Sequence, residues 1–389
     1  MKDAILQRER LWSLDVVRGL ATCLVLLIHL PPTDRKGATP IEPIVQWLHE
    51  IGWIGVDLFF VLSGVLISSL IFREYDSTSS FRPVRFLVRR SFKIWPTYFI
   101  AYGGVTVLRL CVAFSRNDQE SIGLILTGAF WSSVFLQNYW RVEPWQHSWS
   151  IAIEEHFYTA LAALIAVSCA RKSRVDGKQR FRFVLPLWGV SAFLALWSRW
   201  TVSFPSPNWH AAYYPTHQRV DALLFGVLLG YGIWYYPEKI KAKITEWKPF
   251  IFLSAICAFT WPTIWPLHTS SWICFVGFPL LYLSFAPVVA FAAMTVGVGK
   301  ENYPFRILNG LAWVGEFSYT IYIAHSILFM IPGVERVRQF GLGVLSPLGN
   351  ECCLWADRVG FWLASIALGV LLSFLIERPF LRLRSRFVP

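Results

Sequence analysis

Long apolar runs separated by short polar segments recur along the whole chain. Each run has roughly the 20 residues that a helix needs to cross the hydrocarbon core of a bilayer. The pattern therefore predicts an all-α polytopic membrane protein with about ten transmembrane helices. The ten predicted spans are 12–31, 53–72, 94–114, 149–170, 183–202, 219–236, 249–265, 272–295, 307–332 and 360–377. An eleventh apolar run, 121–137, is flanked by tryptophan and polar residues.

Composition supports the membrane interpretation. Hydrophobic residues make up 55% of the 389 residues and charged residues only 15%, whereas a soluble chain carries about 25% charged residues. The net charge is +12, but the basic residues fall in short blocks between the apolar runs. That arrangement is typical of positive-inside bias, so we expect membrane lipid and no nucleic acid among the partners.

The distribution of charge predicts the orientation. With ten spans and the N-terminus inside, the inner segments carry 25 Lys and Arg residues and the outer segments 7. Counting 121–137 as a span would place the basic block 171–182 outside, so we interpret this run as re-entrant or as lying along the outer surface. We predict an integral protein of the plasma or inner membrane, with both termini cytoplasmic. No soluble domain fits in the remaining loops, so residues 1–389 are expected to form one integral-membrane domain without an appended soluble domain.

The cysteines give no sign of a metal site. The seven residues show no spacing typical of metal ligation, and most lie in or beside apolar runs, where cysteine acts as a small hydrophobic side chain. Nothing in the sequence supports a disulfide. We expect no bound metal.

The first span carries charged and polar residues, which are costly to place inside a bilayer and therefore usually have a function. At 100° per residue, Asp15, Arg18, Thr22 and His29 fall within about 60° of one another on a helix. They could form a polar stripe facing a cavity. Alternatively, Asp15 and Arg18 lie in the inner headgroup zone, with Arg18 snorkelling, while His29 caps the outer end.

Other spans carry similar residues at the predicted outer level. Their side chains could converge with His29 on one cavity, where a carboxylate can pair with a cation or hold a histidine in one tautomer. They are Asp57 on the second span, His147 and Glu154 on the fourth, and Arg219 and Asp221 on the sixth. The ninth span adds His325 near mid-membrane, whereas Glu377 and Arg378 are interpreted as an interfacial anchor before a helix-stopping proline.

A basic segment precedes the third span. Arg82, Arg85, Arg89 and Lys93 follow one another at helical spacing, with Arg90 beside them. They could anchor the chain to anionic lipid. They could also clamp the phosphates of a polyphosphorylated cytosolic cofactor, because the arginine fork binds phosphate oxygens bidentately.

Seven motifs follow one another along the chain, at Ser13 to Arg18 with His29, at 55–67, 86–96, 148–158, 219–226, 317–325 and 376–380. In their sequence and order they resemble the acyltransferase-3 family of membrane-bound O-acyltransferases, whose members modify surface polysaccharides, lipopolysaccharide and some antibiotics. Lys93 stands where arginine is usual in that family.

The resemblance implies ten core helices and transfer of an acyl group, usually acetyl, from a CoA thioester to a hydroxyl on the far side of the membrane. It places Arg18 and His29 at the centre of activity. Acyl-CoA is thus expected as donor substrate, with no permanently bound cofactor. The expected acceptor is a carbohydrate or another hydroxylated small molecule.

Residue roles follow from this chemistry. His29 is the expected general base, since histidine accepts a proton near neutral pH, and Glu154 or Asp57 could orient its ring. Direct transfer and an acyl-histidine both stay open, with direct transfer favoured because no separate nucleophilic serine or cysteine stands out. The donor is expected to bind Arg18, Arg89, Arg90 and Lys93, and the acceptor His147, Trp149, Arg219 and Asp221.

A proton-coupled transporter or exporter of a glycan or lipid is the alternative, because intramembrane histidines and carboxylates also suit proton relays. The inner arginine segment favours the enzyme, since a transporter has no special need of a phosphate clamp.

Overall fold

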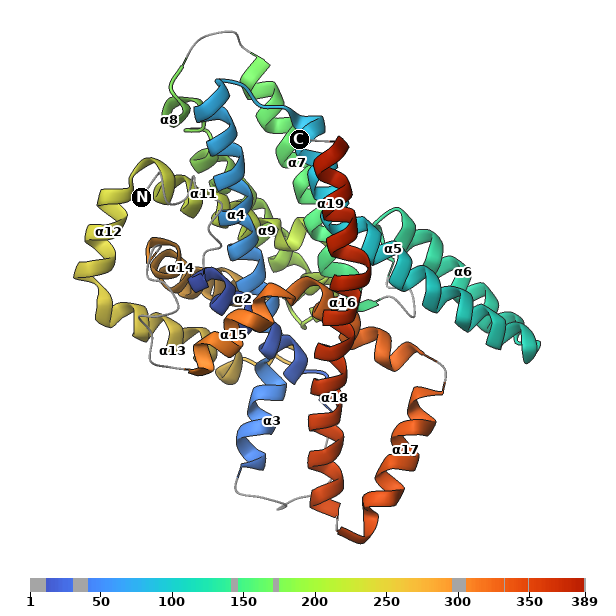
Figure 1. Cartoon of the computed structure of the whole chain (residues 1–389). Coiled ribbons are helices and arrows are strands. Elements are labelled where there is room, and N and C mark those ends of the chain that lie inside the picture. Colours follow the sequence, from blue (N-terminus) through green and yellow to red (C-terminus); the bar gives the residue numbers. More distant parts are fainter. Residues whose placement is uncertain are drawn as a thin grey trace. The chain divides into compact units, whose positions relative to one another are not determined.

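The computed structural model describes residues 12–30, 41–140, 146–170, 175–295, 306–331, 333–348 and 350–387. Within these ranges the chain forms helices joined by turns and contains no strand (Figure 1). The predicted all-α class is therefore confirmed for this part of the chain. The start of the basic block, 171–174, lies outside the described residues.

Six of the described helical segments are long and apolar enough to cross a membrane, or seven if one bent pair is counted. The predicted number of about ten is not confirmed. The six are α4 (Ile54–Thr78), α5 (Pro83–Ser115), α7 (Trp149–Ala170), Gly177–Ser203 with α8 and α9, Ile273–Met294 with η2 and α14, and Glu351–Phe387 with α18, η5 and α19.

Three predicted spans form helices that are too short in the structure to be candidate membrane spans. The first, 12–31, becomes α2 (Trp12–Leu27), and the seventh, 249–265, becomes α13 (Lys248–Ile264). The ninth, 307–332, is broken at Phe317 into α15 (Arg306–Glu316) and α16 (Ser318–Met330). At 1.5 Å per residue, a helix of 16 residues reaches only about 24 Å, which is less than the hydrocarbon core.

The bent pair lies at the sixth predicted span. The segment Trp209–Tyr235, with α10 (Trp209–Tyr213) and α11 (Thr216–Tyr235), meets α12 (Pro237–Glu246) at an angle of 103°. Proline at the first position of α12 explains the break, because its ring disfavours helical geometry at the preceding residue and it has no N–H to continue the hydrogen-bond ladder.

The chain divides into two compact units, each of which gathers segments distant in sequence. The predicted single domain over 1–389 stays a prediction. The first unit comprises Met1–Leu24, Trp53–Val84 and Ile153–Glu316, and the second Val25–Gly52, Arg85–Ala152 and Phe317–Pro389.

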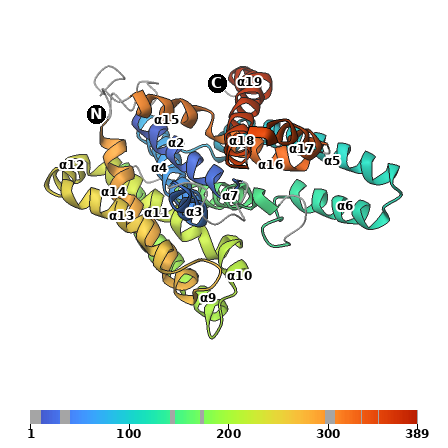
Figure 2. The same ribbon diagram turned by 90° about the horizontal axis from the view of Figure 1, so that it is seen from below.

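Two glycines allow α4 and α11 to cross closely in the first unit. The helices lie side by side (Figures 1 and 2), and a Cβ at Gly64 would lie 2.2 Å from the carbonyl oxygen of Leu223. A Cβ at Gly226 would lie 2.3 Å from the carbonyl oxygen of Val61. Neither position can hold a larger residue unless the helices move apart. Next to α11 pack α9 (Val184–Ser203) and α14 (Phe278–Met294).

A glycine also allows close contact between α2 and α15 in the first unit, where a Cβ at Gly19 would lie 1.9 Å from the carbonyl oxygen of Leu311. Trp12 Nε1 also donates a hydrogen bond to Asn309 Oδ1, 3.1 Å away. The short α2 is therefore held by close backbone contact with another short helix.

In the second unit, α16 packs against α18 (Asn350–Leu372), and a Cβ at Gly369 would lie 2.6 Å from Ile321 Cα. The Arg358 guanidinium on α18 donates two hydrogen bonds of 2.7 and 2.8 Å to the carboxylate of Glu42, which begins α3 (Glu42–Ile51). This bidentate geometry is the strong form of an arginine–carboxylate pair.

The second unit also contains a hairpin of α5 and α6 (Gln119–Ser133), which lie side by side (Figure 1). Ala113 on α5 packs with Ile122 and Ile125 on α6. The helix α6 covers most of the apolar run 121–137 but is not among the candidate spans, so its predicted place at the outer surface stays a prediction. Further helices of this unit are η1 (Gln146–Ser148), α17 (Val334–Leu345), η4 (Ser346–Leu348), η5 (Ser373–Glu377) and α19 (Arg378–Phe387).

Candidate active site

Two histidines from distant parts of the sequence meet in the second unit. Since α2 ends at Leu27, His29 lies in the turn that follows, where its N–H donates to the carbonyl oxygen of Leu26 (3.2 Å). The predicted continuous helix to residue 31 is therefore wrong, and helical spacing does not place His29 on the face of Asp15. The half-buried His29 ring instead lies 4.8 Å, centroid to centroid, from the buried ring of His325 on α16.

His147 adds a third imidazole to this cluster. It lies in η1 (Gln146–Ser148), just before α7, and its ring centroid is 6.2 Å from that of His325. Its Nε2 lies 2.6 Å from the hydroxyl oxygen of Tyr102, which is on α5 and buried. This hydrogen bond holds the ring in one orientation. His147 and His29 thus both lie against His325, and the predicted contact of His147 with the acceptor stays a prediction.

A second tyrosine fixes the backbone around His147. The hydroxyl of Tyr322 donates to the carbonyl oxygen of His147 at 2.8 Å, and Ser150 Oγ lies 2.6 Å from the same hydroxyl. The Tyr322 ring centroid lies 5.4 Å from that of His325. Trp149, which was predicted to contact the acceptor, is buried at the first position of α7.

The sequence prediction did not include the two tyrosines in the site, and it noted His325 without giving it a role. A signal was present for Tyr322, because it precedes His325 by three residues and therefore shares a helix face with it. No comparable signal marks Tyr102, which reaches His147 from another helix.

The cluster can accept and donate protons but has no metal-binding arrangement. Neutral imidazole has one N–H donor and one acceptor nitrogen, so histidines near a substrate can act as base and as hydrogen-bond donor. Within the described ranges, no three His, Cys, Asp or Glu side chains are placed to hold a metal ion.

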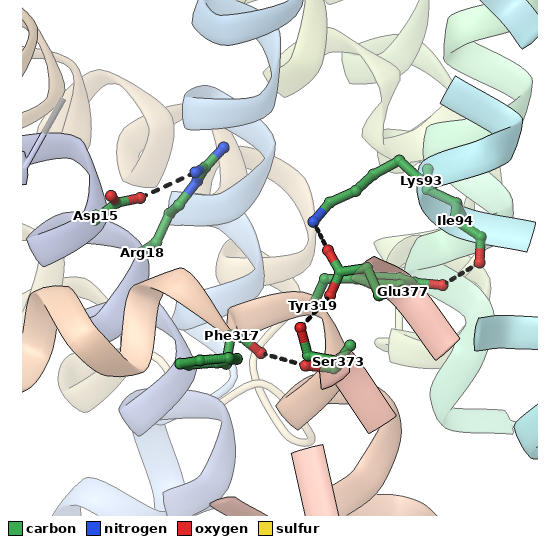
Figure 3. Close-up of polar contacts among 9 residues, drawn as sticks. Asp15, Arg18, Lys93, Ile94, Phe317, Tyr319, Ser373 and Glu377 are labelled. Carbon is green, nitrogen blue, oxygen red and sulfur yellow. Dashed lines mark hydrogen bonds and ion pairs between the residues drawn. The ribbon is translucent and has the colours of Figure 1, made fainter. Parts of the chain in front are cut away.

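The predicted basic segment forms the start of α5, which begins at Pro83, so Arg85, Arg89, Arg90 and Lys93 lie on one helix, whereas Arg82 lies just before it. Lys93 pairs with Glu377, whose other carboxylate oxygen accepts a hydrogen bond from Ser373 Oγ at 2.9 Å (Figure 3). The Tyr319 hydroxyl donates to the carbonyl oxygen of Ile94 at 2.6 Å, next to this pair. Glu377 therefore anchors α5, and the predicted contact of Lys93 with a donor phosphate stays a prediction, as does that of Arg89 and Arg90.

Four predicted or neighbouring polar residues form buried ion pairs in the first unit. Arg219 contacts Asp57 at 2.5 Å, and Arg199 contacts Asp221 at 2.6 Å, with all four side chains almost fully buried. The Arg219 guanidinium also lies 4.0 Å from the ring centroid of Phe278. The sequence prediction did not pair Asp221 with Arg199, although a lone arginine within the apolar run 183–202 was a signal.

The other two predicted residues of the first unit have local partners. Arg18 Nη1 lies 3.1 Å from Asp15 Oδ1 (Figure 3), and Glu154 accepts a hydrogen bond of 2.8 Å from the Tyr158 hydroxyl. The predicted role of Arg18 in donor binding stays a prediction. So does the predicted role of Glu154 or Asp57 in orienting the His29 ring.

Comparison with known proteins identifies relatives. A family profile described as an acyltransferase domain matches residues 11–378. The peptidoglycan O-acetyltransferase OatA of Listeria monocytogenes is 26% identical over 345 residues, which cover 82% of this chain and 49% of that protein. The O-acetyltransferase OatA of Staphylococcus aureus is 25% identical over 327 residues, covering 80% of this chain and 49% of that protein. The chain thus spans about half the length of these relatives. No solved structure matches it.

Proposed function

We propose that this chain, which belongs to the acyltransferase-3 family, transfers an acyl group from acyl-CoA to a hydroxyl group of a carbohydrate. The observation that carries the proposal is the cluster of His29, His147 and His325 in the second unit. An acyl transfer to an alcohol needs a base for the hydroxyl proton, and histidine is the side chain that accepts a proton near neutral pH.

The proposed reaction is a direct transfer. His29, the half-buried member of the cluster, accepts the proton of the acceptor hydroxyl while the hydroxyl oxygen bonds to the thioester carbonyl carbon. The tetrahedral intermediate then collapses, the carbon–sulfur bond breaks, and the CoA thiolate takes the proton back from His29. The base is regenerated and no redox partner is required.

His147 is suited to binding the acceptor beside this base. Its Nε2 is engaged by Tyr102 and its backbone carbonyl by Tyr322, so the ring is preorganised and loses little freedom when a substrate binds. Both tyrosines come from helices of the same unit.

The donor phosphates would bind the first turns of α5. Arg85, Arg89 and Arg90 lie there at helical spacing, and the guanidinium of arginine fits phosphate oxygens bidentately. Lys93 contributes less in this proposal, because Glu377 already neutralises its ammonium.

The relatives' names support the acceptor class. One relative is named as a peptidoglycan O-acetyltransferase, so we propose acetyl as the acyl group and a peptidoglycan-like glycan as acceptor. The excess of Lys and Arg in the predicted inner segments supports a chain with both termini cytoplasmic in the plasma or inner membrane.

The test uses the full chain in lipid nanodiscs with radiolabelled acetyl-CoA and soluble peptidoglycan fragments. The wild type should move label to the glycan, and His29→Ala should abolish this while inserting normally. His156→Ala is the matched control, because His156 lies in the first unit, where its Nδ1 is 2.7 Å from Thr216 Oγ1. Full activity of correctly inserted His29→Ala would remove the assignment. Movement of a glycan across vesicles without label transfer would favour the transporter instead.

A further inference from the structure

His325 is a buried imidazole whose ring nitrogens make no hydrogen bond of normal geometry to the described residues. It lies on α16 with 1% of its surface exposed, and neither Nδ1 nor Nε2 has a hydrogen-bond partner among the described residues. Buried polar side chains are almost always hydrogen-bonded, and leaving one such group unsatisfied costs about 1–3 kcal/mol. A group kept at this cost is a candidate for a ligand contact.

The surroundings of His325 place this group within the reaction site. Its ring lies next to the ring of His29 and faces those of Tyr322 and His147. His147 and Tyr322 are engaged elsewhere, by Tyr102 and by the backbone and Ser150 respectively. His147 therefore has one ring nitrogen engaged, whereas neither ring nitrogen of His325 makes a hydrogen bond to the described residues.

Burial decides which role suits His325. The ionisable side chains in ring contact with it are His29, His147 and Tyr322, and none of these is a carboxylate that would stabilise an imidazolium. A buried charge without such a partner is costly, so His325 is suited to stay neutral and to donate through one N–H. The half-buried His29 is better suited to take up and release a proton.

We propose that His325 is a second catalytic histidine, whose ring N–H donates a hydrogen bond to the carbonyl oxygen of the acyl thioester as negative charge develops there. This inference rests on the proposed function. His29 takes the hydroxyl proton, the new carbon–oxygen bond forms, and His325 stabilises the oxyanion until the thiolate leaves with the proton from His29. A preorganised donor in a site closed to water is worth far more than one in water.

The experiment compares two substitutions in the full chain in nanodiscs, with acetyl-CoA and peptidoglycan fragments. His325→Phe keeps a planar ring of similar shape without nitrogen, and His325→Gln keeps an N–H donor. Thr320→Val is the matched control, because Thr320 is also buried on α16 and its hydroxyl donates to the carbonyl oxygen of Phe317 in its own chain segment. The initial rate, the KM for the donor and the unfolding temperature are measured for each.

The expected loss is kinetic. His325→Phe should lower kcat by about 100- to 1,000-fold, as removal of one oxyanion donor does, with donor KM changed less than about 3-fold. His325→Gln should recover at least about 10-fold of that loss. The acidic limb of its pH–rate profile should keep the wild-type position, because His29 still supplies the base. All three variants should unfold within a few degrees of the wild type.

Four results would overturn the inference. The first three are a wild-type kcat for His325→Phe, a kcat for His325→Gln no higher than for His325→Phe, and a loss of rate that follows the loss of unfolding temperature. The fourth is a displaced acidic limb in His325→Gln, which would make His325 the base instead. In each case the wild type still transfers label, so the proposed function stands. If the wild type transfers no label, the proposed function fails and this inference fails with it.

Discussion

Removing one charge from the buried network of the first unit should destabilise the protein more than removing two. Asp57 and Arg219 contact each other at 2.5 Å, and Arg199 and Asp221 at 2.6 Å, with almost no surface exposed. The four charges sum to zero. Asp57→Asn preserves the shape of the side chain but leaves the network with a net charge of +1 that water does not reach.

The magnitude follows from burial. Breaking a buried ion pair by removing one partner costs about 3–5 kcal/mol, whereas replacing both partners is often close to neutral. We therefore expect about 3–5 kcal/mol of destabilisation for Asp57→Asn and a similar value for Arg219→Met. The double variant should lose no more than either single variant. The resulting coupling energy is about 3 kcal/mol or more, well above the 0.5 kcal/mol at which distant sites deviate from additivity.

The assay is equilibrium unfolding in mixed micelles with increasing SDS, followed by tryptophan fluorescence and paired with acetyl transfer by the same samples. Ser69→Ala is the control, because it removes a hydroxyl on α4 that bonds to the carbonyl oxygen of Leu66 in the same helix. A structural role for the pair is contradicted if Asp57→Asn unfolds at the same SDS concentration as the wild type while its acetyl transfer is lost. Asp57 would then act in the chemistry, as the sequence first suggested, and the pair would not be structural.

Three further predictions concern packing and charge. In the same SDS assay, Gly64→Ala should destabilise the protein by about 1–3 kcal/mol, as overpacking does. Gly103→Ala is the control and should leave the stability unchanged, because a Cβ there meets nothing within 4 Å. An equal effect of both substitutions would contradict the close crossing of α4 and α11. Lys93→Ala should lower the unfolding temperature because Glu377 is left unpaired, with donor KM changed less than about 3-fold; a 10-fold rise in KM at unchanged stability would make Lys93 a donor contact. The hydrogen bonds from the Arg358 guanidinium hold the pKa of Glu42 below its ordinary value of 4.5. This pair should therefore stabilise the protein fully above pH 4.5, and the stabilisation should be lost as pH falls through the lower pKa of the folded state. In thermal melts between pH 3 and 7, Glu42→Gln should remove this pH dependence of the unfolding temperature, and a steeper dependence in the variant would contradict the prediction.

The sequence by itself determined the helical class and most helix positions. Predicted spans such as 149–170 and 183–202 agree with α7 and α9 to within a residue or two. Length and apolar content are local properties of the chain, so they can be read from the sequence. Helix ends and breaks were less predictable, because α2 stops at Leu27 and the ninth span breaks at Phe317 without an apolar-pattern signal.

The tertiary structure alone decided which polar groups meet. The sequence pointed to His29 and His147 as site residues but gave no role to His325, whose contact with His29 joins the end of α2 to α16. It did not pair Lys93 with Glu377, which the fold brings together. Pairing depends on which helix faces pack together, and several polar residues in an apolar chain have more than one possible partner. Periodicity shows the face on which a side chain lies, but the choice of partner requires the packing of the whole unit.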